Sequence, residues 1–265
     1  MKKINVHRVR ALVTRHLMSW PRSLERVADA FWWPTLNLVT WGLVNVYLQG
    51  QTGTSTFFVT LFLGGLLMWT MVVRSQEEMA MLFLQEAWDR NLLNIFSSPI
   101  TIAEFSIASL VLSSIKLVIT FTWMMGLSLF LFAFNIFSLG WALVPYALLL
   151  IVFGWSLGFF INGLIIRYGY RVQVFAWTLS MAIMPFSCVY YPLSALPTWM
   201  QYIGRMFPTT YIFEGMREVF RTRQFDANGY GIAVLFTVFY VLASLKFFLW
   251  SYRKAQESGM IMKFS

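Results

Sequence analysis

The sequence holds few residues that could carry out covalent or metal chemistry. Among 265 residues there is one cysteine, Cys188, so no disulfide can form within the chain, and the two histidines are His7 and His16. We therefore expect both histidines to be solvated and no buried histidine–carboxylate or histidine–metal site to form. No glycine is followed by lysine, which excludes a nucleotide-binding P-loop in this sequence.

Charged residues are also scarce, at 12% of the chain against 58% hydrophobic residues and a mean hydropathy of +0.65. Runs without any charge cover residues 30–73, 117–166 and 172–204, and each exceeds the roughly 20 residues that cross a hydrocarbon core. We therefore expect an integral membrane protein. The net charge of +9 does not indicate nucleic acid, because the basic residues lie beside apolar runs, where anionic lipid headgroups are the expected partner.

The hydrophobicity pattern predicts an all-α integral membrane protein with six transmembrane helices, in one domain over residues 1–265. The predicted spans are residues 30–49, 56–73, 107–134, 141–166, 172–192 and 230–250. Inside them only Lys116 and Lys246 are ionised, whereas ion-coupled transport usually needs buried ionisable groups within the spans. We expect Lys246 to extend to the interface, and Lys116 to reach either the cytoplasmic interface or a water-filled cavity.

An amphipathic segment precedes the first span. Apolar residues recur there every three or four positions, and arginines lie off that stripe, which predicts an interfacial helix over residues 1–29. Pro21 is expected to bend this helix, because proline removes a backbone donor and clashes with the preceding turn. Seven lysines and arginines are spread through residues 1–26 without an apolar core, so we expect no cleavable signal peptide.

The distribution of lysine and arginine predicts the orientation in the membrane. Fourteen of these residues fall on segments assigned to the cytoplasm, and four fall on the outer segment 193–229. The cytoplasmic segments are residues 1–29, 74–106, 167–171 and 251–265. We therefore expect a multi-pass protein of the cell's inner or plasma membrane with both termini in the cytoplasm.

Two linkers are too long to be simple turns. Residues 74–106 are rich in acids, although a cytoplasmic segment favours basic residues, and they predict a helix that continues the second span, followed by a short helix that ends before Ser97-Ser98-Pro99. Residues 193–229 predict two short re-entrant helices, one after Pro197 with Thr198 as its cap and one after Pro208. The second of these helices places alternating acids and bases on one face: Glu214, Arg217, Glu218 and Arg221.

These pieces together resemble the permease subunit of a type-2 ABC exporter over essentially the whole chain. The most specific similarity lies in YPLSALPTWMQYIGRMFPTTYIFEGMR, residues 191–217. The residues that match the family's order are Pro192, Pro197, Trp199, Met200, Gln201, Pro208, Thr210, Tyr211, Glu214, Gly215 and Arg217. The stretch FSSPITIAEF is similar to another family motif, from which Ile100, Ala103 and Phe105 depart.

The resemblance implies a half-transporter. Two permeases would pair, with a homodimer favoured over a heterodimer, and each would dock a separate ATP-binding-cassette ATPase through a coupling helix in residues 74–106. ATP and magnesium would then bind to the ATPase, and the permease would be neither an enzyme nor a holder of any cofactor. The residues implied for ATPase coupling are Glu77, Glu78, Glu86, Trp88, Asp89 and Arg90.

The resemblance also implies a pathway at the dimer interface, closed on its outer side by the re-entrant helices. Pathway-lining candidates are Trp33, Asn37, Gln173, Trp177, Tyr190 and Tyr191. Outer-gate candidates are Pro197, Trp199, Pro208, Tyr211, Glu214 and Arg217. We expect Glu214 and Arg217 to hold their helix against its own span or a dimer mate, so loss of either charge should impair export more than expression. Exchange of the two charges should preserve export better than either single substitution.

The function that this reading favours is outward movement of an amphipathic or lipid-linked substrate, since aromatic side chains offer a surface on which rings can stack. Three alternatives stay open at this point: efflux of drug-like small molecules, a membrane enzyme such as a lipid-linked transferase, and a non-transporting scaffold. An enzyme would need clustered acids or histidines near one interface, and only residues 74–105 offer acids, without a metal-ligand spacing.

Overall fold

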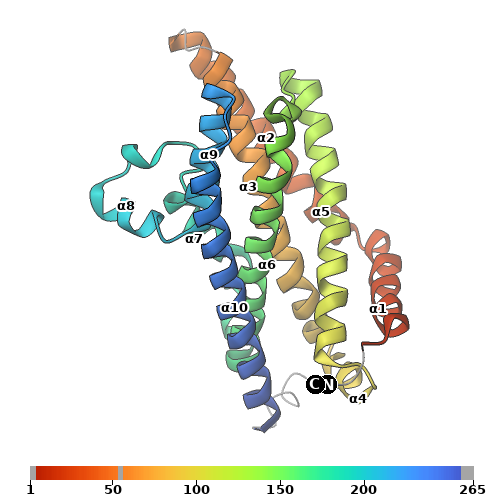
Figure 1. Cartoon of the computed structure of the whole chain (residues 1–265). Coiled ribbons are helices and arrows are strands. Elements are labelled where there is room, and N and C mark those ends of the chain that lie inside the picture. The colour runs from red at the N-terminus through yellow and green to blue at the C-terminus, as the bar shows by residue number, and fades with distance from the viewer. Residues whose placement is uncertain (1–3, 53–55, 258–265) are drawn as a thin grey trace.

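The computed structural model describes the backbone of residues 4–52 and 56–257, and the side chains of these residues except at 25, 51–52, 56–60, 92–93, 96, 138–139 and 170. The described part is helical without strands, which confirms the predicted all-α class (Figure 1). Its long helices are α2 (Leu24–Thr52), α3 (Thr56–Trp88), α5 (Ile102–Phe132), α6 (Leu143–Tyr168) and α10 (Ala227–Glu257).

Helix α6 is the centre of the bundle. It packs along α10 on one side and along α3 on another, and α3 in turn packs against α5. The close approach of α6 to α3 depends on Gly154 and Gly158, because a Cβ on either would lie within 2.7 Å of α3 atoms. Small residues four apart are a common way for membrane helices to bring their backbones together.

Three described helices are long and apolar enough to cross a membrane: α5, residues 140–168 and α10. They correspond to the third, fourth and sixth predicted spans, with boundaries shifted by a few residues. That α2 and α3 also cross the membrane remains a prediction.

The fifth predicted span, residues 172–192, is not one helix. Helix α7 (Phe175–Ile183) has nine residues and continues into a 3₁₀ turn, η4 (Met184–Phe186), which contains Pro185. The chain then turns through Cys188, whose φ of 54° is in the left-handed region. Hydropathy could not show this break, because the turn itself is uncharged and apolar.

The N-terminal segment breaks where Pro21 predicts. Helix α1 (Val6–Ser19) is followed by a 3₁₀ turn, η1 (Trp20–Arg22), and α2 begins at Leu24, so the predicted helix over residues 1–29 ends ten residues early. Helix α1 also packs against α5 and buries Val9 and Leu12 in the core, so the protein itself covers part of its apolar stripe, while Val6 stays exposed.

At one end of the bundle lie α4 (Leu92–Ser97), the start of α1 and the end of α10, while the turn between α5 and α6 lies at the other end (Figure 1). Helix α3 continues through the acidic linker to Trp88, as predicted. Between α7 and α10, η5 (Leu193–Ala195) and two shorter helices follow, α8 (Thr198–Gly204) and α9 (Pro208–Thr222).

The predicted cap at Thr198 is wrong, because Pro197 occupies the N-cap position of α8 and no side-chain cap forms. Helix α8 projects from the side of the bundle (Figure 1). The re-entrant depth of α8 and α9 stays a prediction.

Candidate functional site

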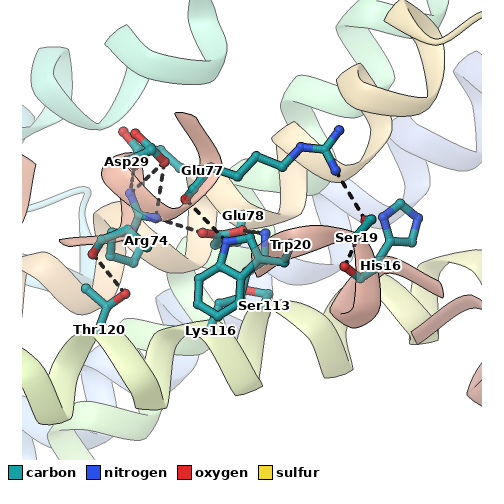
Figure 2. Close-up of polar contacts among 12 residues, drawn as sticks. His16, Ser19, Trp20, Asp29, Arg74, Glu77, Glu78, Ser113, Lys116 and Thr120 are labelled. Atoms are coloured by element: carbon teal, nitrogen blue, oxygen red, sulfur yellow. Dashed lines mark hydrogen bonds and ion pairs between the residues drawn. The ribbon is translucent and has the colours of Figure 1, made fainter. Parts of the chain in front are cut away.

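A buried ion network joins three helices at the level where the charge-free runs end (Figure 2). Arg74 of α3 places its guanidinium 3.3 Å from Asp29 of α2, 3.0 Å from Glu77 and 2.7 Å from Glu78. The second oxygen of Glu78 accepts a hydrogen bond from Lys116 of α5 at 2.6 Å. Asp29 precedes the first charge-free run, Arg74 follows it, and Lys116 precedes the second, so the network lies at one end of the apolar segments.

Burial decides the electrostatics of this network. The side chains of Arg74, Glu78 and Lys116 are 4%, 7% and 9% exposed, whereas that of Asp29 is 47% exposed. Burial raises the pKa of Glu77 to about 7; the carboxylates of Asp29 and Glu78 favour this rise and Arg74 opposes it. A buried charge that loses its partner destabilises the protein. The ion pairs therefore hold the three helices together, because separating them would leave unpaired charges in the interior.

Lys116 does not extend alone to an interface. Besides its bond to Glu78, its ammonium lies 5.6 Å from the centre of the Trp20 ring, and it lines a cavity of about 480 Å³. Of the two expected positions, the structure supports the one at a cavity. We call this the charged cavity; its polar and aromatic lining includes Arg26, Asp29, Trp33, Glu77, Glu78, Trp88, Asp89, Lys116 and Trp177.

A second cavity, of about 420 Å³, adjoins the charged cavity and has five aromatic residues in its lining. We call it the aromatic cavity; its lining includes Asp29, Trp33, Asn37, Trp41, Trp69, Arg74, Glu77, Trp177 and Tyr190. The two linings share Asp29, Trp33, Glu77 and Trp177. Tyr190 stacks on Phe62 with ring centres 4.5 Å apart and faces Trp41 at 6.3 Å. A pair of cavities thus leads from the ion network into a ring-lined interior.

The end of α3 nearest to α4 is held from the side by α1. Glu86, which is buried, binds Arg15 and lies 2.7 Å from the imidazole Nε2 of His16, and it accepts a hydrogen bond from Asn91 at 2.7 Å. Nearer the start of α1, Arg8 donates to the carbonyl of Pro99 at 2.5 Å. Helix α1 therefore contacts the chain before α4, at Glu86, and after it, at Pro99.

The position of His16 corrects two expectations, that both histidines are solvated and that no histidine–carboxylate contact forms. Its side chain is only 10% exposed and contacts Glu86. Burial lowers the pKa of His16 to about 4, and the positive charges of Arg15, Lys116 and Arg26 lower it as well. His7 is exposed, as expected.

The comparison with known families decides what kind of protein carries this arrangement. The family model described as ABC-2 type transporter matches residues 8–220, which covers most of the chain from α1 through α9. The chain belongs to the ABC-2 type transporter family. No curated protein matches the chain. The match makes this chain the membrane-embedded permease component of an ABC transporter, a transport component that is not itself catalytic.

The permease brings four of the six predicted pathway residues together. Trp33, Asn37, Trp177 and Tyr190 line the aromatic cavity. The other two line neither cavity: Gln173 accepts a hydrogen bond from Trp88 at 3.2 Å, and the hydroxyl of Tyr191 donates to the carbonyl of Pro185 at 2.6 Å. That any of these residues contacts a substrate remains a prediction.

Sequence reasoning missed several residues of the aromatic cavity's lining, among them Asp29, Trp41, Trp69 and Arg74. The sequence did hold a signal for the two charged residues. Asp29 and Arg74 stand at the two ends of the first charge-free run, and a hairpin brings the ends of such a run together. No such signal distinguishes Trp41 and Trp69 from the other tryptophans of the chain.

The six predicted coupling residues of the permease divide into two groups. Glu77, Glu78 and Glu86 direct their carboxylates into ion pairs inside the chain, with Arg15 as the partner of Glu86. Trp88, Asp89 and Arg90 are exposed at the end of α3, where Arg90 adopts a left-handed φ of 52° as the helix stops. The second group is therefore available to a docked partner, and the first is available only if the network opens.

On the predicted outer side, the acid–base ladder of the permease forms two separate pairs. Glu214 and Arg217 form an ion pair at 3.1 Å, and Glu218 and Arg221 form an exposed one at 2.9 Å. Glu214 also accepts a hydrogen bond from the backbone N–H of Leu193 at 2.7 Å. Arg217 donates to the carbonyls of Tyr191, at 2.8 Å, and of Cys188. We call these contacts the α9 latch, since they tie α9 to the chain that follows α7.

The other predicted gate residues surround this latch. Pro208 is the first residue of α9, and the hydroxyl of Tyr211 donates to the carbonyl of Arg205 at 2.9 Å. Pro197 precedes α8, and Trp199 is exposed with its ring edge towards Phe186. The structure thus brings these residues into one region between α7 and α9, while their role as a gate stays a prediction.

Proposed function

We propose that this permease is the membrane half of an ABC exporter that moves an amphipathic or lipid-linked substrate outward, powered by a separate ATPase subunit. The observation that carries the proposal is the pair of adjoining cavities, whose linings hold polar groups such as Asp89 and Lys116 in one and rings such as Trp41 and Tyr190 in the other. A polar cavity next to an aromatic one suits a molecule with one polar and one apolar end.

The proposal includes two protein partners. The ATPase docks at the exposed end of α3 and at α4, on the cytoplasmic side, in the inner or plasma membrane with both termini in the cytoplasm. The second partner is another permease, most simply an identical copy. Trp32 and Trp33 support this pairing, because they are 61% and 59% exposed on α2 in the single chain and tryptophan is enriched in buried interfaces.

Reconstitution tests the proposal. The permease is purified with the ATP-binding protein encoded beside it and placed in proteoliposomes, and ATP-dependent movement of lipid-linked or amphipathic molecules is measured. We expect co-purification, a two-to-two complex by mass, and transport that Trp33→Ala or Trp177→Ala reduces at least several-fold. Failure to co-purify, or transport that does not need ATP, would contradict the proposal.

Efflux of drug-like small molecules is the second candidate. The size of the aromatic cavity favours it, since about 420 Å³ falls within the roughly 300–1,000 Å³ typical of sites for drug-sized ligands. Competition in the same proteoliposomes separates the candidates. Inhibition of drug efflux by a lipid-linked glycan supports one shared site, and efflux of drugs without any movement of the lipid-linked molecule favours the second candidate.

A further inference from the structure

The aromatic cavity has in its lining an acid that its neighbours do not neutralise fully. Asp29 lines both cavities and its side chain is 47% exposed. Its nearest cation is Arg74, at 3.3 Å, and that guanidinium is closer to Glu77 and Glu78. Figure 2 shows the three acids arranged around Arg74. Among the described residues, the aromatic cavity has no base in its lining besides Arg74, so a ligand there meets the carboxylate of Asp29 without a positive charge outside the network.

The linings of the two cavities together hold one more acid than base. The acids that line the two cavities are Asp29, Glu77, Glu78 and Asp89, and the bases are Arg26, Arg74 and Lys116. Two of these bases, Arg74 and Lys116, are already paired inside the network. Of these acids, only Asp29 and Glu77 line both cavities, and their side chains are 47% and 15% exposed, so Asp29 is the acid on which recognition of a cation would depend.

The rings beside Asp29 add a second attraction for positive charge. Trp33 and Trp177 line both cavities, and Trp41 and Trp69 continue the wall of the aromatic cavity. The face of an indole ring carries a negative quadrupole field, and indole binds organic cations better than tyrosine or phenylalanine does. An aromatic wall next to a carboxylate is an arrangement suited to ammonium groups that carry several carbon substituents.

We propose that the two cavities select amphipathic organic cations, with the positive group between Asp29 and the indoles of Trp33 and Trp177. The apolar part of such a molecule lies deeper, against Trp41 and Tyr190. Arg74 does not turn the site into an anion site, because it is 4% exposed and three carboxylates lie within 3.3 Å of it. That this cation is a transported substrate rests on the proposed function, whereas its binding to the cavities is independent of that function.

Equilibrium dialysis of the purified full chain in detergent tests the charge preference. The probes are tetraphenylphosphonium and tetraphenylborate, which have nearly the same size and opposite charge. The proteins are the wild type, Asp29→Asn, Asp29→Glu, and Glu257→Gln as a control that removes one exposed acid at the end of α10. Uptake of each probe by the micelle is the same for all four proteins and cancels in the comparison.

We expect Asp29→Asn to bind tetraphenylphosphonium about tenfold more weakly, which is the order expected for loss of one partly solvated charge contact. Asp29→Glu and Glu257→Gln should keep the wild-type affinity, and tetraphenylborate should bind no more weakly to Asp29→Asn than to the wild type. Equal binding of the cation to wild type and Asp29→Asn, or an equal loss for both probes, would overturn the inference.

The two proposals can fail separately. Cation binding that depends on Asp29 without any ATP-driven transport would overturn the exporter proposal and leave the site intact. ATP-driven transport of neutral or anionic amphipaths, with no effect of Asp29→Asn on cation binding, would overturn the charge preference and leave the exporter intact.

Discussion

At the scale of single residues, Glu78 holds two cations at once. One of its oxygens contacts Arg74 and the other contacts Lys116, and all three side chains are less than 10% exposed. Removal of one partner from a buried ion pair leaves an uncompensated charge, whereas removal of both partners can be nearly neutral. Glu78 is therefore the residue at which the network is most sensitive.

We predict that Glu78→Gln destabilises the permease by about 3–5 kcal/mol, because it leaves Lys116 buried without a counter-ion. Thermal unfolding, monitored by size-exclusion chromatography, measures the change in stability. The double variant Glu78→Gln, Lys116→Met should recover most of the loss. Glu257→Gln, which breaks an exposed pair with Lys254, should stay within about 0.5 kcal/mol of the wild type.

The α9 latch leads to a second prediction at this scale. Glu214 accepts from a backbone N–H and Arg217 donates to two backbone carbonyls, so each side chain is matched to a backbone group as well as to its ion partner. Exchange of the charges would place an acceptor against carbonyls and a donor against an N–H. This reverses the expectation from the ion pair alone.

We predict that Glu214→Gln and Arg217→Ala each reduce export more than expression, and that the double variant Glu214→Arg, Arg217→Glu is no better than either. Transport in vesicles, normalised to the amount of permease, is the measurement. Glu218→Arg, Arg221→Glu is the matched control, since that pair is exposed and its exchange should be tolerated. Recovery of export by the exchange at 214 and 217 would show that the backbone contacts do not matter.

At the scale of elements, the packing of α6 on α3 depends on the absence of two side chains. A Cβ on Gly154 would lie 2.6 Å from the carbonyl oxygen of Val72 and 2.7 Å from the Cβ of Ser75. We predict that Gly154→Ala forces the two helices apart and lowers the melting temperature by several degrees, which corresponds to about 1–3 kcal/mol of overpacking. Gly126→Ala on α5 has nothing within 4 Å of its Cβ and should be neutral or slightly stabilising.

The docking of α1 should depend on pH through His16. Its pKa falls from 6.5 in the undocked state to about 4 in the docked one, so the docked helix holds the neutral imidazole. Docking is therefore fully stabilised above pH 6.5 and weakens by about 1.4 kcal/mol for each pH unit as the pH falls from there towards 4. Hydrogen exchange of α1 should accelerate from pH 7 to pH 4.5 after correction for intrinsic rates. His16→Gln should remove most of this pH dependence, and an unchanged dependence would contradict the assignment.

At the scale of the whole molecule, the sequence predicts the long apolar helices well, because length and hydropathy determine them. The predicted spans 107–134, 141–166 and 230–250 match α5, α6 and α10 to within a few residues, apart from a longer C-terminal end of α10. The break after α7 was not predictable in this way, since Pro185 and Cys188 lie in an uninterrupted apolar run.

The candidate site was predictable only in part. The resemblance pointed to four residues that line the aromatic cavity. The ion network was not predictable, because it depends on contacts between residues 38–45 positions apart, such as Glu78 with Lys116 and Asp29 with Arg74. One sequence without its fold cannot pair acids and bases over that separation. The same reason explains why Glu86 was assigned to a partner protein, although α1 supplies its contacts.

The last prediction concerns the complex with the ATPase, and it follows from the difference in burial between two of the predicted coupling residues. Asp89 is exposed at the end of α3, so Asp89→Lys should weaken binding of the ATPase about tenfold, or about 1.4 kcal/mol, while the permease itself stays as stable as the wild type. Glu86 is buried against Arg15, His16 and Asn91, so Glu86→Gln should lower the stability of the isolated permease and change ATPase binding only through that loss.

Titration of the ATPase onto permease in nanodiscs measures the binding, and thermal unfolding of the permease alone measures the stability. Glu257→Lys controls for a charge reversal elsewhere on an exposed helix end. If Asp89→Lys binds the ATPase normally and a stable Glu86→Gln does not, then the network on α3 opens on docking and its carboxylates face the ATPase in the complex.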